Sequence, residues 1–265
     1  MNTRAPGGQP PLRLSVIIPT WRDAENLAVL LPKLSCLHGV AEIIVANASR
    51  DSDSAPLARQ WGATLLKVSP PNRGAQMNAG AEMATGDVLL FQHADTDLQQ
   101  VHADAIATAL RNPEIIGGAF YRKFDGRHPR LMWLEPVARF LSRHGGTLYG
   151  DQSVFVRREV FEELGGFKKF PLMEDVEFSK RMRAAGRIVL LDPPVQSSAR
   201  HHTRKGAWRM TLRNALFIVL YKFGVSPARL HRWYYPAPEL SRRARDSAPR
   251  VGDAPAAEQA SSRAS

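Results

Sequence analysis

The sequence predicts an α/β protein with a doubly wound sheet, mixed but mainly parallel, and with helices on both faces. Two observations support this fold class. Short apolar stretches alternate with helix-like stretches from Leu14 onward, which is the order that builds strand–helix–strand units. The stretch Val88–Phe91 is continuously apolar, as is typical of a strand buried on both faces of a parallel sheet.

The first half of the chain is expected to form four strands separated by three helices. The first strand covers residues 14–18 and ends at Pro19, and Thr20 or Asp23 caps a helix that continues to about Leu37. The other strands are expected at 42–45, 63–68 and 88–91, and the other helices at 55–61 and 75–83.

The second half continues the pattern with a helix at 101–110 and a strand that begins at Gly117. Residues 128–144 are expected to form an amphipathic helix, which either faces an acceptor or packs as an ordinary helix. A strand, a helix, a Gly-Gly-Phe turn and a further helix are expected within residues 150–187.

The fourth strand is followed by polar residues, His93, Asp95 and Asp97. In open α/β sheets, ligands bind beyond the carboxyl ends of the strands. A carboxylate there is suited to hold a hard divalent cation against a phosphate. The alternative is that both aspartates only cap the next helix.

Composition indicates a soluble globular protein, because 44% of its 265 residues are hydrophobic. We expect residues 12–195 to form the folded domain and residues 196–239 a basic, amphipathic helical extension. The ends, 1–11 and 240–265, are expected to be disordered. Cys36 is the only cysteine, which excludes an intrachain disulfide, and its apolar surroundings favour a buried structural thiol.

No secretory signal and no apolar window of ~18 residues is evident, so we expect a cytoplasmic protein without a spanning helix. The net charge is +11, and no Asp or Glu lies between Asp192 and Glu239. Such a field predicts an anionic partner. Residues 208–223 form an amphipathic stretch that either lies at the inner membrane face or packs on the domain. A nucleic acid is disfavoured as a partner, because no aromatic stacking platform accompanies the basic residues.

Four polar segments occur in a fixed order: PTWRDAENL, VANASRD, NRGAQMNAG and QHADTD. With them, and with the pair Glu174–Asp175 later, the chain resembles the family-2 glycosyltransferases of the GT-A fold. Within that family it is most similar to the bacterial subgroup with HADT at the DxD site. The resemblance covers roughly Leu12 to Pro194. It implies a GT-A-like sheet, a nucleotide-diphosphate sugar as donor and a divalent metal, Mn²⁺ or Mg²⁺.

For donor binding, the resemblance implies that Pro19, Thr20 and Asn47 lie near the base. It implies that Arg73 and Asn78 lie near the base or the diphosphate. Asn47 stands where the family commonly has an acid, and its amide can both accept and donate hydrogen bonds.

For the metal, the resemblance points to Asp95, which occupies the last position of the DxD motif. His93 occupies the first position, where imidazole suits Mn²⁺ better than Mg²⁺. His93 has a second interpretation as a hydrogen-bond partner of the donor's ribose or phosphate. Asp97 is a weaker candidate ligand.

For catalysis, Asp175 matches the family's base, and Glu174 is expected to orient the site or the acceptor. A carboxylate base with an in-line donor gives direct displacement with inversion. As an alternative, Asp175 is only an acid that stabilises a helix N-terminus. His201 and Arg204 either contact the diphosphate or belong to a solvated basic loop.

We therefore expect a metal-dependent inverting glycosyltransferase that acts on a lipid-linked or amphiphilic acceptor. A nucleotidyltransferase is a rival, although the segment after the first strand lacks the Gly-rich basic signature typical of that class. A catalytically degenerate nucleotide-sugar binder is the second rival, because Ala46 and His93 depart from the family pattern.

Overall fold

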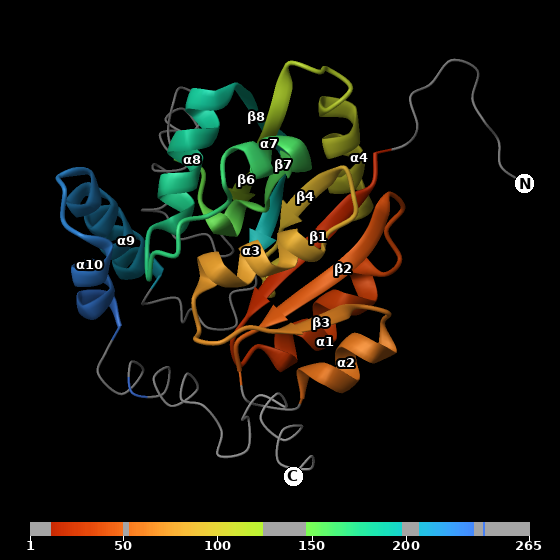
Figure 1. Cartoon of the computed structure of the whole chain (residues 1–265), viewed down its shortest axis with the longest axis horizontal. Helices are drawn as coiled ribbons and strands as arrows, with labels where there is room; N and C mark the ends of the chain where they lie inside the picture. Colours follow the sequence, from red (N-terminus) through yellow and green to blue (C-terminus); the bar gives the residue numbers. More distant parts are fainter. Residues whose placement is uncertain (1–11, 50–52, 124–146, 198–206, 236–240, 242–265) are drawn as a thin grey trace, which may run out of the picture.

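The structure, a computed structural model, describes residues 12–49, 53–123, 147–197, 207–235 and 241 (Figure 1). In this part of the chain, eight strands form one sheet in the order β3-β2-β1-β4-β7-β6-β8-β5. The strands are Leu14–Thr20 (β1), Val40–Asn47 (β2), Thr64–Lys67 (β3), Val88–Phe91 (β4), Thr96–Asp97 (β5), Ile115–Lys123 (β6), Val154–Arg157 (β7) and Arg187–Ser197 (β8). The helices are Ala24–Leu34 (α1), Ser54–Gln60 (α2), Arg73–Met83 (α3), Gln100–Ala109 (α4), Arg158–Glu163 (α7), Glu174–Ala185 (α8), Ala207–Lys222 (α9) and Pro227–Tyr234 (α10), with a 3₁₀ turn η1 at Gly150–Gln152.

The sheet is mixed. Strands β3, β2, β1 and β4 run parallel, and β6 is parallel to β8. Strand β7 is antiparallel to both β4 and β6, and β5 is antiparallel to β8. The predicted fold class, a mixed and mainly parallel sheet, is therefore confirmed.

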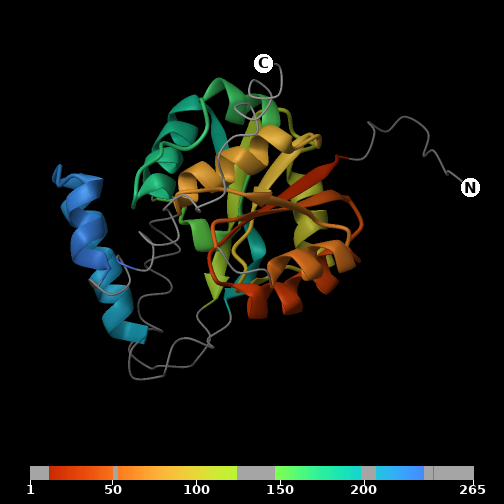
Figure 2. The same ribbon diagram turned by 60° about the horizontal axis from the view of Figure 1, so that its bottom comes forward.

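Helices cover both faces of the sheet (Figure 2). Neighbouring residues of β1 point to opposite faces, so Val16 packs in the core with α1 and α4, whereas Ile17 packs in the core with α3 and α8. Helix α3 approaches the sheet closely at Gly80, where a Cβ atom would overlap the Ile17 side chain.

Strand β1 continues through Pro19 to Thr20, two residues beyond the predicted last residue, Ile18. The carbonyl of Ile17 accepts a hydrogen bond from the Gln92 amide on the β4 side, and Pro19 has the same orientation two residues later. Because β4 ends at Phe91, no ladder partner is lost where Pro19 lacks its N–H. Proline cannot donate a hydrogen bond to a neighbouring strand, so it is normally confined to sheet edges. Pro19 lies inside a central strand, but it has no neighbouring strand on its N side.

The first helix ends at Leu34, three residues before the expected end. Cys36 lies in the following turn and is exposed. The prediction of a buried structural thiol is therefore wrong, because α1 and its buried face end at Leu34, two residues before the cysteine.

Helices α9 and α10 form a hairpin beside α8, at one side of the sheet domain (Figures 1 and 2). No described helix has the length and apolar content needed to cross a bilayer. The expected helix at 128–144 and the expected disordered segment 1–11 lie outside the described residues, as does nearly all of 240–265.

Candidate active site

The carboxyl ends of β1 and β2 place two predicted donor-site residues side by side. Thr20 and Asn47 are paired in the parallel register and are both buried. The Oδ1 atom of Asn47 accepts a 2.8 Å hydrogen bond from the Ser49 amide. Asn47 keeps its Nδ2 donor and the second lone pair of its Oδ1 for a ligand.

The Gln76 side chain joins α3 to these strand ends. Its buried Nε2 donates to the carbonyl oxygen of Thr20 at 2.8 Å and to that of Ala46 at 2.7 Å. Sequence reasoning did not select Gln76 as a site residue. The signal in the sequence was one polar residue in a predicted helix of mostly small residues just after Arg73. Only the tertiary contacts show that this residue joins α3 to the strand ends.

The turn after β4 is held by Gln92, which is fully buried. Its Nε2 donates to the Thr96 carbonyl at 2.7 Å, and its Oε1 accepts from the Ser153 hydroxyl at 2.7 Å. These two hydrogen bonds hold the turn of residues 93–95. In this turn, His93 Nδ1 lies 3.8 Å from Asp95 Oδ1. Two of the predicted metal and donor residues are therefore neighbours at the end of β4.

Asp97 belongs to a different environment. Its carboxylate contacts Lys33 Nζ and accepts from Gln99 Nε2 at 2.9 Å. Burial by itself raises the pKa of Asp97, but the hydrogen bonds and the Lys33 charge outweigh burial and lower it. The structure thus gives Asp97 an ion-pair partner on α1.

Helix α8 begins with Glu174 and Asp175. Asp175 Oδ1 accepts from the Val176 amide at 2.8 Å, and Oδ2 accepts from the Gly150 amide at 2.9 Å. The carboxylate is held by two backbone donors, one on its own helix and one on η1. Each oxygen retains a further lone pair for another partner.

Gly150 is where the predicted site residues meet. A Cβ atom on Gly150 would overlap Arg73 Nη2 and would lie 3.1 Å from His93 Nε2, while its amide donates to Asp175. Arg73 Nε is in turn 3.6 Å from Glu174 Oε1. Gly150 therefore brings the start of α3, the turn after β4 and the start of α8 together without filling the space between them.

Arg73 carries two buried nitrogens, Nε and Nη2, for which the described residues provide no hydrogen-bond partner. Burying a guanidinium N–H without an acceptor costs free energy. The Nε of this guanidinium lies 3.6 Å from Glu174 Oε1. A guanidinium whose buried N–H groups lack acceptors is suited to bind an anionic ligand.

Asn78, a predicted donor-site residue, makes two hydrogen bonds to the loop before α8. Its Nδ2 donates to the Phe167 carbonyl and its Oδ1 accepts from the Phe167 amide, both at 2.8 Å. Asn72 caps α3 and also donates to the Phe170 carbonyl at 3.1 Å. Both asparagines of the segment NRGAQMNAG thus attach α3 to the loop that leads to Glu174.

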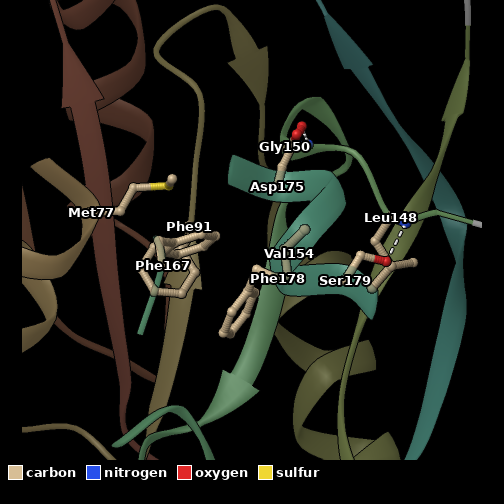
Figure 3. A pocket seen from close by; sticks show the side chains of 9 residues that line it. All are labelled: Met77, Phe91, Leu148, Gly150, Val154, Phe167, Asp175, Phe178 and Ser179. Carbon is tan, nitrogen blue, oxygen red and sulfur yellow. Dashed lines mark hydrogen bonds between the residues drawn. The ribbon is translucent and has the colours of Figure 1, made fainter. Parts of the chain in front are cut away.

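An apolar pocket lies below Asp175 and Gly150 (Figure 3). Three aromatic rings line it: the ring centroids of Phe91 and Phe167 are 4.8 Å apart, and those of Phe167 and Phe178 are 4.3 Å apart. The pocket is lined by Met77, Phe91, Leu148, Gly150, Val154, Phe167, Asp175, Phe178 and Ser179. Asp175 thus has apolar side chains next to it on the pocket side.

Tyr149 is a further polar residue next to this carboxylate, and sequence reasoning did not select it. Burial, together with the negative charges of Asp175 and Asp151, raises the pKa of Tyr149 above its ordinary value of 10.0, against a smaller opposite effect of Thr147. Its phenol therefore stays protonated at neutral pH.

The donor set at the end of β4 fits a divalent cation that shares its ligands with a substrate. Asp95 and His93 offer a carboxylate and an imidazole from one turn. No cluster of three or more potential protein ligands occurs among the described residues. Hard cations in phosphate-transfer sites are commonly bound by one or two protein groups plus substrate phosphates. His201 and Arg204 lie outside the described residues.

Comparison with known proteins is informative at the level of the family. Residues 15–165, more than half of the chain, match the family described as Glycosyl transferase family 2. This protein belongs to glycosyl transferase family 2. The match extends from β1 through α7, so it includes the ends of β1, β2 and β4 and the Gly150 turn.

Two curated relatives each match part of the chain. A 4,4'-diaponeurosporenoate glycosyltransferase of Staphylococcus haemolyticus is 31% identical over 103 residues, 36% of this chain and 28% of that protein. The O-antigen biosynthesis protein RfbC of Myxococcus xanthus is 27% identical over 227 residues, 72% of this chain and 17% of that protein. The chain thus spans less than a third of the length of either relative.

Among solved structures, the mannosyltransferase PcManGT of Pyrobaculum calidifontis, in complex with GDP-Man and Mn²⁺, superposes with a TM-score of 0.60 at 19% identity. The match covers 96% of this chain and 79% of that one. The similarity shows a shared fold.

Proposed function

We propose that this family-2 member transfers a sugar from a nucleotide-diphosphate donor to an acceptor hydroxyl, with inversion at the anomeric carbon. The observation that carries the proposal is the convergence at Gly150. One turn brings a guanidinium, an imidazole and a carboxylate together from three separate elements. Glycosyl transfer needs these three functions: neutralisation of the leaving diphosphate, positioning of the donor and removal of the acceptor proton.

In this proposal the nucleotide lies across the ends of β1 and β2. Thr20 supplies a buried hydroxyl that lacks a hydrogen-bond partner among the described residues. Asn47 presents an amide donor, and its oxygen, which accepts from the Ser49 amide, has one lone pair left. Pro19 precedes Thr20 in β1 and is paired with Ala46, the neighbour of Asn47. An amide donor suits a carbonyl oxygen of the base, which uracil and guanine both carry.

The diphosphate is assigned to Arg73, with His93 and Asp95 beside it. A bidentate guanidinium is the geometry that phosphate prefers, and Arg73 has two buried nitrogens available for it. A divalent ion, Mn²⁺ or Mg²⁺, held by Asp95 and His93 would supply charge neutralisation as the diphosphate leaves.

Asp175 is assigned as the base. Backbone donors hold both of its oxygens in place, so the carboxylate is oriented before the acceptor arrives. Glu174 pairs with Arg73 at 3.6 Å and is assigned to orient that arginine. A direct attack by the deprotonated acceptor inverts the anomeric centre.

The acceptor is proposed to be lipid-linked or amphiphilic. The helical hairpin beside α8 carries exposed apolar side chains, and it packs against the start of the helix that carries Asp175. A location at the inner face of the membrane accords with such an acceptor.

The first test is nucleotide binding measured by calorimetry. UDP, GDP, CDP and TDP are titrated with Mn²⁺, Mg²⁺ or EDTA. We expect one nucleotide to bind only with metal, and Asp95→Ala to weaken that binding by about tenfold or more. Asp97→Ala is the matched control, because that carboxylate pairs with Lys33, and it should bind as the wild type does.

Donor turnover then separates an enzyme from a degenerate binder. The wild type should hydrolyse or transfer the sugar of the matching donor, and Asp175→Asn should lose this activity while retaining nucleotide affinity. Binding without turnover in the wild type would favour the degenerate binder. Absence of nucleotide binding under every metal condition would overturn the proposal.

A further inference from the structure

Helix α9 exposes an apolar stripe. The stripe comprises Leu212, Leu216 and Val219, together with Phe223 just after the helix, with exposed fractions of 62%, 53%, 47% and 84%. Steps of four, three and four residues place these side chains on one face of a helix. Trp233 on α10 is also 58% exposed. Contiguous exposed apolar residues of this kind mark an interaction surface.

The opposite side of the same hairpin is buried against α8. Phe217 and Leu230 form a cluster with Met173 and Val176. These last two residues flank Glu174 and Asp175 in the sequence. The hairpin is therefore attached to the start of α8, next to the base candidate, while its stripe faces outward.

The charge of the hairpin indicates what covers the stripe. Arg213, Lys222, Arg229 and Arg232 are exposed on α9 and α10, and no acidic residue lies between Asp192 and Glu239. A second copy of the same basic face would repel the first. An anionic lipid surface offers negative headgroups for the basic residues and an apolar layer for the stripe.

We propose that the α9–α10 hairpin docks on an anionic lipid surface through Leu212, Leu216, Val219 and Phe223. Docking holds the start of α8, and with it Asp175, at that surface. The consequence for the acceptor, which would be a molecule anchored in the same surface, rests on the proposed function. The docking itself does not.

The test is co-sedimentation of the full chain with vesicles. Vesicles of phosphatidylcholine alone are compared with vesicles containing about a third phosphatidylglycerol, at low and at high salt. We expect the wild type to sediment with the anionic vesicles. Raised salt should weaken binding only in part, because the stripe inserts apolar side chains as well.

Leu216→Glu and Phe223→Glu place a charge in the stripe at exposed positions, so the fold is kept. Each should lower vesicle affinity by roughly tenfold or more. Val101→Glu is the matched control. Val101 is a 47% exposed apolar residue on α4, and its replacement changes the net charge by the same amount. It should bind vesicles as the wild type does.

Three results would overturn the proposal. The wild type does not sediment with any vesicle, or the stripe variants bind as well as Val101→Glu does, or light scattering shows a dimer that Phe223→Glu dissociates. Nucleotide calorimetry on the same samples keeps this outcome separate from the proposed function. Vesicle binding without nucleotide binding refutes the transferase alone, and the reverse refutes the docking surface alone.

Discussion

Gly150 shows at the residue scale how a missing side chain organises a site. Arg73 Nη2 occupies the space that a Cβ atom would need, and His93 Nε2 borders it. The amide of the same residue donates to Asp175. The turn therefore serves the site through its backbone and through the room that it leaves.

We predict that Gly150→Ala displaces the Arg73 guanidinium. The obstructing atom is the far end of a flexible side chain, so the loss of folding stability should stay near 1 kcal/mol. Nucleotide affinity should fall by about tenfold, since a charge-assisted hydrogen bond is worth about 1.5–3 kcal/mol. Urea unfolding and calorimetry measure the two effects separately.

The control for this substitution is Gly186→Ala. A Cβ atom there would lie 2.9 Å from Ile116 Cγ2, a side-chain methyl group rather than backbone, at the end of α8 and remote in sequence from the Gly150 turn. It should cost similar stability and leave nucleotide affinity unchanged. Equal binding losses in both variants would contradict a specific role for the Gly150 turn.

At the scale of elements, the loop between α7 and α8 is clamped from both sides. Asn78 on α3 binds the Phe167 backbone. Arg181 on α8 pairs with Glu177 at 2.6 Å and donates to the Gly166 carbonyl at 2.7 Å. Gly166 has a φ of +66°, a backbone conformation that favours glycine. The loop is thereby fixed where it delivers Glu174 and Asp175.

The ion pairs of Glu177 make the stability of this loop depend on pH. Burial acts to raise the pKa of Glu177, but hydrogen bonds from Arg181 and Lys168, and their charges, outweigh it and lower the pKa below 4.5. A lowered pKa in the folded state contributes stability that is present above the ordinary value and is lost as the pH falls through the folded value.

We predict that the free energy of unfolding decreases as the pH falls below about 4.5, and that Glu177→Gln makes this decrease shallower. At neutral pH the same substitution should cost about 1–3 kcal/mol, because Arg181 and Lys168 lose a charged acceptor. Urea midpoints between neutral and acidic pH test both effects. Glu82→Gln, at an exposed position of α3, should leave the curve unchanged. An unaltered acid slope in Glu177→Gln would refute the assignment.

At the scale of the whole molecule, two bodies of different size meet at α8. The sheet domain has a core on each face, whereas the α9–α10 hairpin is attached through a small cluster around Phe217 and Leu230. A small interface of this kind opens more readily than the sheet.

We predict that Leu230→Ala loosens the hairpin and spares the sheet. Leu230 is fully buried, and such truncations cost about 2–5 kcal/mol. Hydrogen exchange should accelerate across α9 and α10, while β1 and β4 keep their protection. Val219→Ala, at an exposed position, is the control. Equal loss of protection in the hairpin and in the sheet would mean that both unfold as one unit.

Much of the fold follows from local sequence patterns. The apolar run Val88–Phe91 matches β4 to the residue, and the helix expected after the Gly-Gly-Phe turn is α8, which begins at Glu174. The family was expected from the resemblance of four ordered polar segments, of which three lie at the ends of β1, β2 and β4 and one begins α3. The strand and the helix depend on neighbours in the chain, so periodicity and turn chemistry reveal them.

The tertiary structure decided which of these residues act together. It brought Arg73, His93 and Asp175 to one glycine from positions far apart in the chain, assigned the amides of Gln76 and Asn78 to backbone partners, and left Cys36 exposed. The physical reason is that hydrogen bonds and close contacts act over a few ångströms in space. Residue type and periodicity therefore place a side chain on an element, and only the packing of the elements determines what it touches.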